Sequence, residues 1–344
     1  MGSAIGLDSK VMRVMGEKRA SRWPLVLTLL LAAVLLFLAF RGANWRELVG
    51  TVQQARLGYL VLAVLVSSSS YWVRGLRWRV LICAEKVVAP ATVFWAVMVG
   101  YLGNSYLPAR AGEVIRAVML GRSASLSKIF VLATALTERM LDVIALVLIS
   151  LAAILSLEGL PGWLLNAVKV MGALGLAGLL VVFAAPRLEN LLRRSLTWLP
   201  LPATLHARLM NVTEQFLLGM RAFQHPGRAL SFASLTVVIW LADALGAMVI
   251  AQALNLSLTL PQSLLLLAAM GLASAVPSTP GYVGVYQFVA VTVLAPFGFS
   301  QSAALAYILV AQAVAYLVVI VWGLAGLWQL GVPGLQVEND SPSN

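Results

Sequence analysis

The sequence is short of charged residues, cysteine and histidine. Of its 344 residues only 11% are Asp, Glu, Lys or Arg, whereas 61% are hydrophobic. A soluble domain of this size carries about a quarter charged residues. A chain with so little charge cannot build a solvated surface, so lipid must cover most of it. The single Cys83 excludes an internal disulfide. Together with His206 and His225 it has neither the number nor the spacing of ligands of a structural zinc site.

Sequence motifs for catalysis are also missing. The chain has no nucleotide-binding loop, no Ser/His/Asp set, no His-containing metal motif and no soluble region large enough for catalysis. We therefore expect no cofactor, no bound metal and no enzymatic activity. The 24 Lys and Arg residues outnumber the 13 Asp and Glu residues, but they flank apolar runs. This is the pattern of cytoplasmic membrane flanks, so we expect no nucleic-acid partner.

The basic residues also indicate how the chain is oriented. All Lys and Arg lie between Lys10 and Arg228, and five of them precede the apolar run Pro24–Phe40. That run is long for a cleaved signal, and Arg41 follows it where small residues would mark a cleavage site. We predict an uncleaved first span in the cytoplasmic membrane, with residues 1–23 as a cytoplasmic tail. Residues 24–330 then form one membrane domain and residues 331–344 a C-terminal tail.

Apolar runs account for most of this domain. A bilayer core needs roughly 20 apolar residues per helix. The basic segment 187–228 contains an amphipathic pattern and is expected on the cytoplasmic side. The sequence predicts an all-α, polytopic protein with about eight transmembrane or re-entrant helices. After the first span, the runs are Leu57–Val73, Val87–Leu107, Ile129–Leu157, Trp163–Ala185, Ala229–Leu254, Gln262–Val276, Tyr282–Phe299 and Ser302–Leu330.

Two of these runs are broken by proline and glycine in the same way. In each half of the chain a proline is followed four residues later by a glycine. Interrupted segments at corresponding positions indicate a substrate site between inverted repeats, with broken helices near the membrane midplane. Chance explains the pattern about equally well, because proline and glycine are common in membrane helices. The candidate gate residues are Pro108, Gly112, Pro277, Pro280, Gly281 and Gly284.

The segment LPARAGEVIRA carries the first cluster of charge within an apolar region. Arg110, Glu113 and Arg116 are three residues apart, so a helix starting near Pro108 brings neighbours within pairing distance. The free N–H groups of a helix start attract anions, and two arginines against one carboxylate leave a net positive site. The alternative is that Arg116 extends to the cytoplasmic headgroups.

The segment TERMLD carries the second cluster. Glu138 and Asp142 are one helical turn apart, with Arg139 beside them, inside a long apolar run. A charge in hydrocarbon costs at least about 2.5 kcal/mol, so such residues face protein or water and usually have a task. One arginine cannot neutralise two carboxylates, and we expect Arg110 or Arg116 to supply a second cation. A purely structural ion-pair network is a nearly equal alternative.

Polar residues near the second break form the third candidate region. Thr279 and Pro280 fit a helix start, whose N–H groups would meet an anion. Asp243 is a lone acidic residue in the Ala229–Leu254 run, and is either a pairing partner or an acid on the substrate side.

Four stretches together resemble one known family. They are RGLRW at Arg74–Trp78, GNSYLPARAGEVIRA at Gly103–Ala117, TERMLD at Thr137–Asp142 and VPSTPGYVGV at Val276–Val285. In this order they resemble the membrane region of lysylphosphatidylglycerol synthases and the stand-alone flippase-like proteins similar to it. The resemblance implies a helical membrane domain of eight elements that moves or binds lipids. Functional positions implied by it, besides those already named, include Asn104 in the polar cavity. Arg74, Arg77 and Trp78 are assigned to the cytoplasmic flank.

The chain departs from this family pattern at two positions. It has Tyr282 where a second glycine is common, and Gln287 where an acidic residue is common; we keep Gln287 in the candidate cavity. It also has no soluble aminoacyl-transferase region, so it is not expected to synthesise aminoacyl lipid itself. We predict a translocase for an anionic phospholipid or a lipid-linked isoprenoid, whose partner is the membrane lipid and which allows a homo-oligomer. The alternatives are a membrane enzyme or accessory subunit of lipid glycosylation, and a small-anion transporter.

Overall fold

The computed structural model describes residues 23–107, 111–157, 225–274 and 279–331, with isolated positions between 162 and 214. Several predictions fall outside these residues. They concern both tails, the span Trp163–Ala185, nearly all of segment 187–228, and the side chains of Pro108, Arg110 and Pro277.

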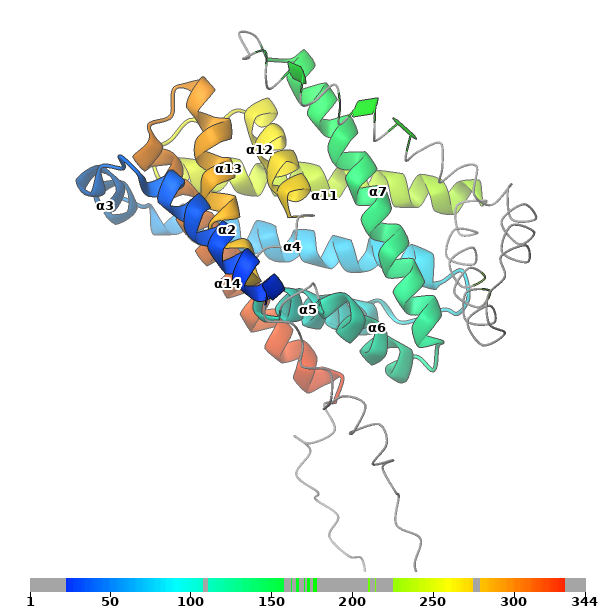
Figure 1. The fold of residues 1–344 in the computed structure, drawn as a ribbon. Coiled ribbons are helices and arrows are strands. Elements are labelled where there is room, and N and C mark those ends of the chain that lie inside the picture. The colour runs from blue at the N-terminus through cyan, green and yellow to red at the C-terminus, as the bar shows by residue number, and fades with distance from the viewer. Residues whose placement is uncertain are drawn as a thin grey trace, which may run out of the picture.

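All regular structure in the described residues is helical, which confirms the predicted fold class. The chain forms ten α-helices and two short 3-10 turns over these residues (Figure 1). They are α2 (Trp23–Phe40), α3 (Trp45–Gln53), α4 (Leu57–Ile82), α5 (Pro90–Tyr106), α6 (Gly112–Ser123), α7 (Lys128–Leu155), α11 (Pro226–Ala253), α12 (Leu260–Ala273), η3 (Pro280–Tyr282), α13 (Val285–Leu294), η4 (Ala295–Phe297) and α14 (Gln301–Gln329).

Three of these helices, α4, α11 and α14, are long and apolar enough to cross a membrane, and the bent pair α2 and α3 is a fourth candidate. Helix α7 has 28 residues, but Glu138, Arg139 and Asp142 interrupt its apolar face. Large hydrophobic side chains such as Phe37, Leu65 and Leu324 stay exposed on the outside of the bundle. Together these features identify a multi-pass membrane protein.

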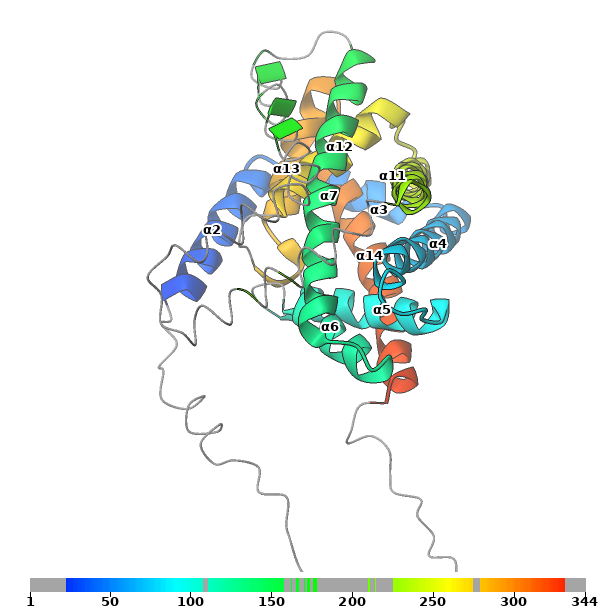
Figure 2. The same ribbon diagram turned by 90° about the vertical axis from the view of Figure 1, so that its right-hand side faces the viewer.

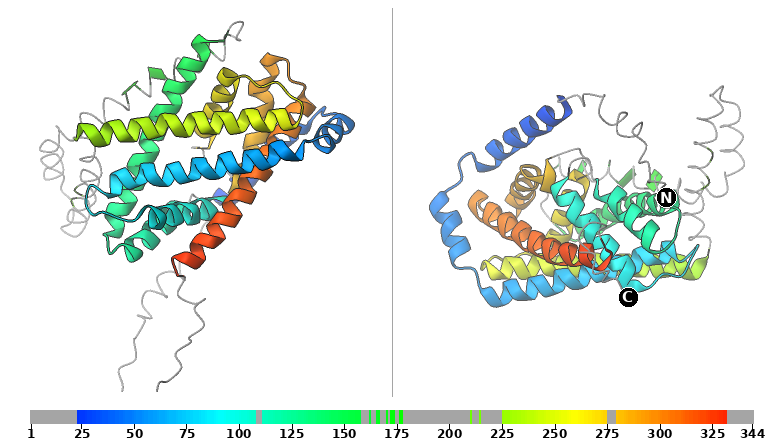
Figure 3. Two further views of the ribbon diagram at one scale, coloured as in Figure 1. Left: turned by 180° about the vertical axis from the view of Figure 1, so that it is seen from behind. Right: turned by 90° about the horizontal axis from the view of Figure 1, so that it is seen from below.

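Helices α4 and α11 pack side by side and antiparallel along one face of the fold (Figure 3). The backbone N–H of Arg56, at the start of α4, donates to the carbonyl of Ala253 at the end of α11 over 2.9 Å. Each long helix is followed by a hairpin of two short helices and then by another long helix. Helix α7 packs on α12 of the other half, and α14 packs on α5. In each half, the last long helix thus packs on the first short helix of the other half, which is the arrangement expected of inverted repeats.

The first hairpin, α5 and α6, closes through glycine. A Cβ atom built on Gly112 would lie 1.9 Å from the carbonyl oxygen of Gly100, so no larger residue fits at this crossing. The described part of α6 begins at Gly112, and Ala111 provides no capping side chain. The predicted start near Pro108 lies in residues 108–110, outside the described part of the chain.

The second hairpin, α12 and α13, turns through residues with left-handed backbone. Gly281, Tyr282 and Gly284 have φ angles of 70°, 59° and 89°. Pro280 begins a 3-10 turn of only three residues, and the Thr279 hydroxyl donates to the carbonyl of Val283 instead of capping a helix. The predicted anion-binding helix start is thus absent from the described part of this turn.

The tips of the two hairpins meet inside the bundle. The turn η3 contacts α5, and a Cβ built on Gly281 would lie 3.6 Å from the carbonyl of Ser105. Figure 2 shows the α5/α6 hairpin and the α12/α13 hairpin at opposite ends of the bundle, with α7 and α14 passing between them. Residues on both tips therefore reach one central space.

Candidate functional site

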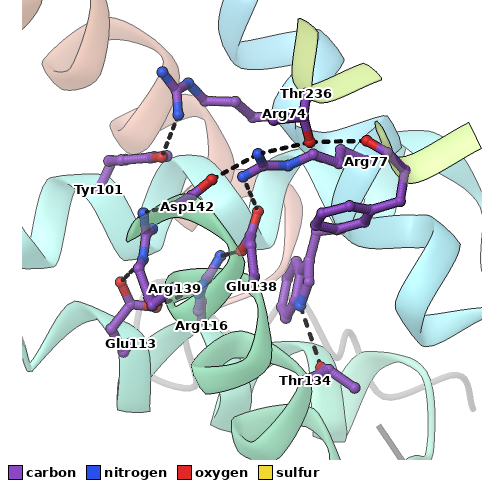
Figure 4. A network of polar contacts seen from close by, with 12 residues as sticks. Arg74, Arg77, Tyr101, Glu113, Arg116, Thr134, Glu138, Arg139, Asp142 and Thr236 are labelled. Atoms are coloured by element: carbon purple, nitrogen blue, oxygen red, sulfur yellow. Dashed lines mark hydrogen bonds and ion pairs between the residues drawn. The ribbon is translucent and has the colours of Figure 1, made fainter. Parts of the chain in front are cut away.

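Six charged side chains from α4, α6 and α7 form a closed ring of ion pairs, which we call the charged ring. Its members alternate in sign around the circuit (Figure 4). Nitrogen-to-oxygen distances between neighbours range from 2.5 to 3.3 Å. In order around the ring the members are Arg77, Glu138, Arg116, Glu113, Arg139 and Asp142, and Asp142 returns to Arg77.

One side of the charged ring is sealed. The side chains of Arg77, Arg116 and Glu138 are only 1–3% exposed. The guanidinium of Arg116 lies 4.5 Å from the centre of the Trp78 ring, and the Trp78 indole donates to the hydroxyl of Thr134. A cation over a desolvated tryptophan face is attracted to it by about 2 kcal/mol. This half of the ring has no room for a ligand and serves to join three helices.

The other side of the ring faces a cavity. The Arg139 side chain is 25% exposed, against 10% for Glu113 and 8% for Asp142. Nε of Arg139 donates to Glu113 over 2.9 Å, and Nη1 donates to Asp142 over 3.3 Å. Within the described ranges, its second terminal nitrogen, Nη2, has no hydrogen-bond partner, so Arg139 keeps donors for a ligand.

A second ion pair lies on the same cavity, between Arg74 of α4 and Asp243 of α11. Asp243 also accepts from the Ser70 hydroxyl over 2.5 Å, and Arg74 reaches the hydroxyl of Tyr101 over 3.5 Å. Both charged side chains are mostly buried, at 14% and 18% exposure. Ring and pair together place four arginines against four carboxylates, so the described site has no net charge. The predicted net positive site counted Arg110, which lies outside the described residues.

The cavity has a volume of about 360 Å³. Its charged end carries Arg74, Glu113, Arg139 and Asp243, and Asn104 donates to Glu113 beside them over 3.3 Å. Residues of both hairpins line it, together with α4, α11 and α14. The rest of the wall is largely apolar or aromatic, and its aliphatic members include Ala247, Ile250, Leu267, Met270, Ile308 and Val319.

Amide side chains brace the second hairpin next to this cavity. Gln287 is buried; its carbonyl accepts from the Gly284 N–H over 2.7 Å and its amide donates to Gln312. Gln312 and Tyr316 in turn donate to the carbonyl of Gly281 over 3.2 and 2.6 Å. Gln287 therefore holds the turn in shape and does not line the cavity.

The structure brings together most of the residues that the sequence singled out. Arg116 supplies the second cation predicted for Glu138. Arg77 supplies a third that the sequence analysis assigned to a cytoplasmic flank. Arg74 and Trp78, assigned with it, are likewise drawn inside, because α4 continues nine residues beyond the predicted end at Val73. The four- and three-residue spacing of Ser70, Arg74 and Arg77 was the available signal for a polar helix face.

No group of three or more His, Cys, Asp and Glu side chains that could hold a metal ion occurs in the part of the chain that the structure describes.

Comparison with known proteins supports a lipid-related function in a membrane. The family model of the Lysylphosphatidylglycerol synthase TM region matches residues 25–323, as the sequence stretches suggested. Glycosyltransferase AglD of Haloferax volcanii is 24% identical over an alignment 370 positions long, which covers 95% of this chain. The chain spans 58% of the length of that relative. No solved structure matches.

The relative's name corrects one expectation. We expected no enzymatic activity because soluble catalytic motifs are missing. The comparison contradicts this expectation, since a protein named a glycosyltransferase aligns with almost the whole chain.

Proposed function

We propose that this chain, which belongs to the family of the lysylphosphatidylglycerol synthase TM region, binds an anionic lipid by its headgroup and moves it across the cytoplasmic membrane. The headgroup occupies the central cavity, and the hydrocarbon chains stay in the bilayer. A volume of about 360 Å³ suits a headgroup, whereas a whole two-chain lipid is too large for it.

The observation that carries this proposal is the two-ended wall of the cavity. One end holds Arg74 and Arg139 beside their carboxylate partners, which suits an anionic headgroup, and the rest of the wall is largely apolar or aromatic. Arg139 is the principal anion-binding group, because it is the most exposed member of the charged ring and retains a terminal nitrogen for a new hydrogen bond. Arginine binds phosphate through two parallel N–H bonds, which fixes the orientation of the bound group.

The neutral charge balance of the site favours transient binding over permanent binding. An incoming phosphate competes with Glu113 and Asp142 for the guanidinium of Arg139. When the phosphate leaves, Arg139 forms its ion pairs with these two carboxylates again. Such exchange limits the affinity, as transport requires, because a site that binds too tightly cannot release its cargo. The ring therefore works as a reversible receptor for the headgroup.

The hairpins supply the moving parts of the proposed mechanism. The cavity is walled by Asn104 and Ser105 of the first tip and by Gly281 and Tyr282 of the second. Because both tips come from equivalent parts of inverted repeats, tilting one half against the other opens the cavity to one leaflet and closes it to the other.

A liposome assay tests the proposal. Purified protein is reconstituted with a fluorescent anionic phospholipid, and a membrane-impermeant quencher reports how much lipid reaches the outer leaflet. We expect protein-dependent movement that Arg139→Gln abolishes. Arg46→Gln is the matched control, because Arg46 is an exposed arginine of α3 far from the ring. Absence of movement for the unaltered chain across a panel of anionic lipids contradicts the proposal.

A second candidate function follows from the glycosyltransferase name of the relative. In this case the same cavity holds a lipid acceptor or donor during sugar transfer, with Glu113 or Asp243 as the acid or base on its wall. Mass spectrometry of the lipid after incubation with the purified chain separates the two functions. A change in lipid mass favours transfer, and movement of an unchanged lipid favours translocation.

A further inference from the structure

The tyrosines of this protein gather at the central cavity. Six of the eight tyrosines in the chain line it, while no phenylalanine of the described residues does, although the chain has 11. The six come from five different elements, so no single helix face explains the grouping. They are Tyr71, Tyr101, Tyr282, Tyr286, Tyr307 and Tyr316.

Tyrosine in place of phenylalanine is energetically unfavourable in a cavity that binds only apolar groups. A phenolic hydroxyl placed in a low-dielectric site needs a hydrogen-bond partner, whereas phenylalanine or leucine lines a hydrocarbon pocket without that need. Tyr101 and Tyr316 have protein partners in Arg74 and the carbonyl of Gly281. With the other tyrosine hydroxyls, the wall suits a ligand that carries polar groups beyond the charged end, next to flat apolar surfaces.

The charged end of the cavity further limits which hydrogen-bonding groups the ligand can have. Carboxylates only accept hydrogen bonds and arginines only donate them. A phosphate also only accepts, so it satisfies Arg74 and Arg139 but offers nothing to Glu113 or Asp243, both of which line the cavity. A hydroxyl group donates and accepts at once. A headgroup with several hydroxyls therefore matches all four charged side chains and the tyrosines as well.

Tyr282 adds evidence specific to this chain. Its φ angle of 59° is one that bulky residues rarely adopt, and strain of this kind concentrates at functional sites. The strained backbone holds the Tyr282 ring parallel to that of Tyr286, with centroids 4.9 Å apart and an interplanar angle of 11°. Both residues line the cavity and present a broad, flat surface.

We infer that the cavity binds a polyhydroxylated headgroup, a sugar or cyclitol attached to the lipid phosphate, whose ring packs against Tyr282 and Tyr286. The phosphate lies at Arg139, and the hydroxyls contact the tyrosine wall and the carboxylates of Glu113 and Asp243. This inference rests on the proposed lipid-binding function and specifies its substrate class.

Three lipids with identical dioleoyl chains test the inference by native mass spectrometry of the full chain in detergent. Phosphatidic acid offers phosphate alone, glucosyldiacylglycerol offers the sugar alone, and phosphatidylinositol offers phosphate and a polyol ring together. We expect phosphatidylinositol to bind about tenfold more tightly than phosphatidic acid, the gain of one or two net hydrogen bonds. Glucosyldiacylglycerol is expected to bind measurably despite its lack of charge.

Two variants locate the effect. Tyr282→Gly removes the ring and relieves the backbone, so we expect phosphatidylinositol binding to fall several-fold more than phosphatidic acid binding. Tyr71→Phe keeps the ring and removes one hydroxyl, and we expect a several-fold loss for phosphatidylinositol and glucosyldiacylglycerol that exceeds the loss for phosphatidic acid. Tyr59→Phe is the control, because Tyr59 lies on α4 outside the cavity.

The outcomes separate the two proposals. Equal binding of phosphatidic acid and phosphatidylinositol by the unaltered chain overturns the headgroup inference and leaves the lipid-binding function intact. An equal loss for both lipids in Tyr282→Gly, with Tyr71→Phe without effect, also overturns it. If none of the three lipids binds, the proposed function itself fails.

Discussion

Arg74 and Asp243 form an ion pair across two antiparallel helices, and each lies 17 residues after the first residue of its helix, Leu57 in α4 and Pro226 in α11. The two residues therefore occupy equivalent positions in the two halves of the protein. A pair that joins equivalent positions lies close to the axis that relates the halves. Near this axis the backbones of the two halves match each other, but the two equivalent positions carry side chains of opposite charge.

Exchanging the two charges of this pair tests that relationship. Arg74→Asp alone and Asp243→Arg alone each place like charges together in a mostly buried site, and we expect both to lower thermal stability in detergent. The double variant restores an ion pair at equivalent positions, so it is expected to recover at least half of the lost stability. A double variant that is less stable than both single variants contradicts the equivalence.

Removing Arg77 is expected to destabilise the fold strongly. Arg77→Ala leaves Glu138 and Asp142 without one of their cations in a sealed environment, and breaking a buried pair in this way costs about 3–5 kcal/mol. Reversible unfolding of the detergent-solubilised chain measures the loss. Arg46→Ala, on an exposed face, is the matched control and is expected to change stability by less than about 0.5 kcal/mol.

Arg116 and Arg139 are expected to differ in what their loss does. Arg116 is 2% exposed and held against Trp78, so Arg116→Ala should lower stability by several kcal/mol. Arg139→Ala, at the cavity, should cost less stability and reduce anionic-lipid binding at least tenfold. Thermal unfolding and lipid binding are measured on both variants. The division of roles is wrong if Arg116→Ala loses binding while keeping normal stability.

Glycine at position 112 is expected to be indispensable for the first hairpin. Gly112→Ala places a methyl group 1.9 Å from the Gly100 carbonyl, which forces the two helices apart at a cost of about 3 kcal/mol. Gly50→Ala in α3 meets no atom within 4 Å and should be neutral or stabilising by up to about 1 kcal/mol. The difference in unfolding free energy between the two variants is the test, and equal values contradict the tight crossing.

The sequence alone predicted the elements that depend on local pattern. The apolar runs predicted the positions of α4, α5, α7, α11, α12 and α14. Most of the helix ends lie within a few residues of the predicted ones, because helix formation in a bilayer requires continuous apolar surface. Paired proline and glycine breaks predicted two interrupted hairpins. The charges of α7 indicated a polar site, since a charge is kept in such a helix only when it has a partner.

The partners themselves were harder to predict because they depend on how helices cross. Arg77 follows an apolar run, as flanking arginines do, and only the packing of α4 against α7 brings it to Glu138. The closure of six charges into a ring is likewise a property of three helices together, and no spacing in one segment encodes it. The gathering of tyrosines from five elements belongs to the same category.

The equal number of positive and negative members in the charged ring and the Arg74–Asp243 pair bears on the response of this protein to membrane voltage. A voltage does work of about 2.3 kcal/mol per elementary charge per 100 mV only on net charge that crosses the field. These eight side chains sum to zero, so rocking them as one body transfers no charge. In the proposed transport cycle these eight side chains therefore add nothing to the electrical cost, whereas the charge of the cargo does.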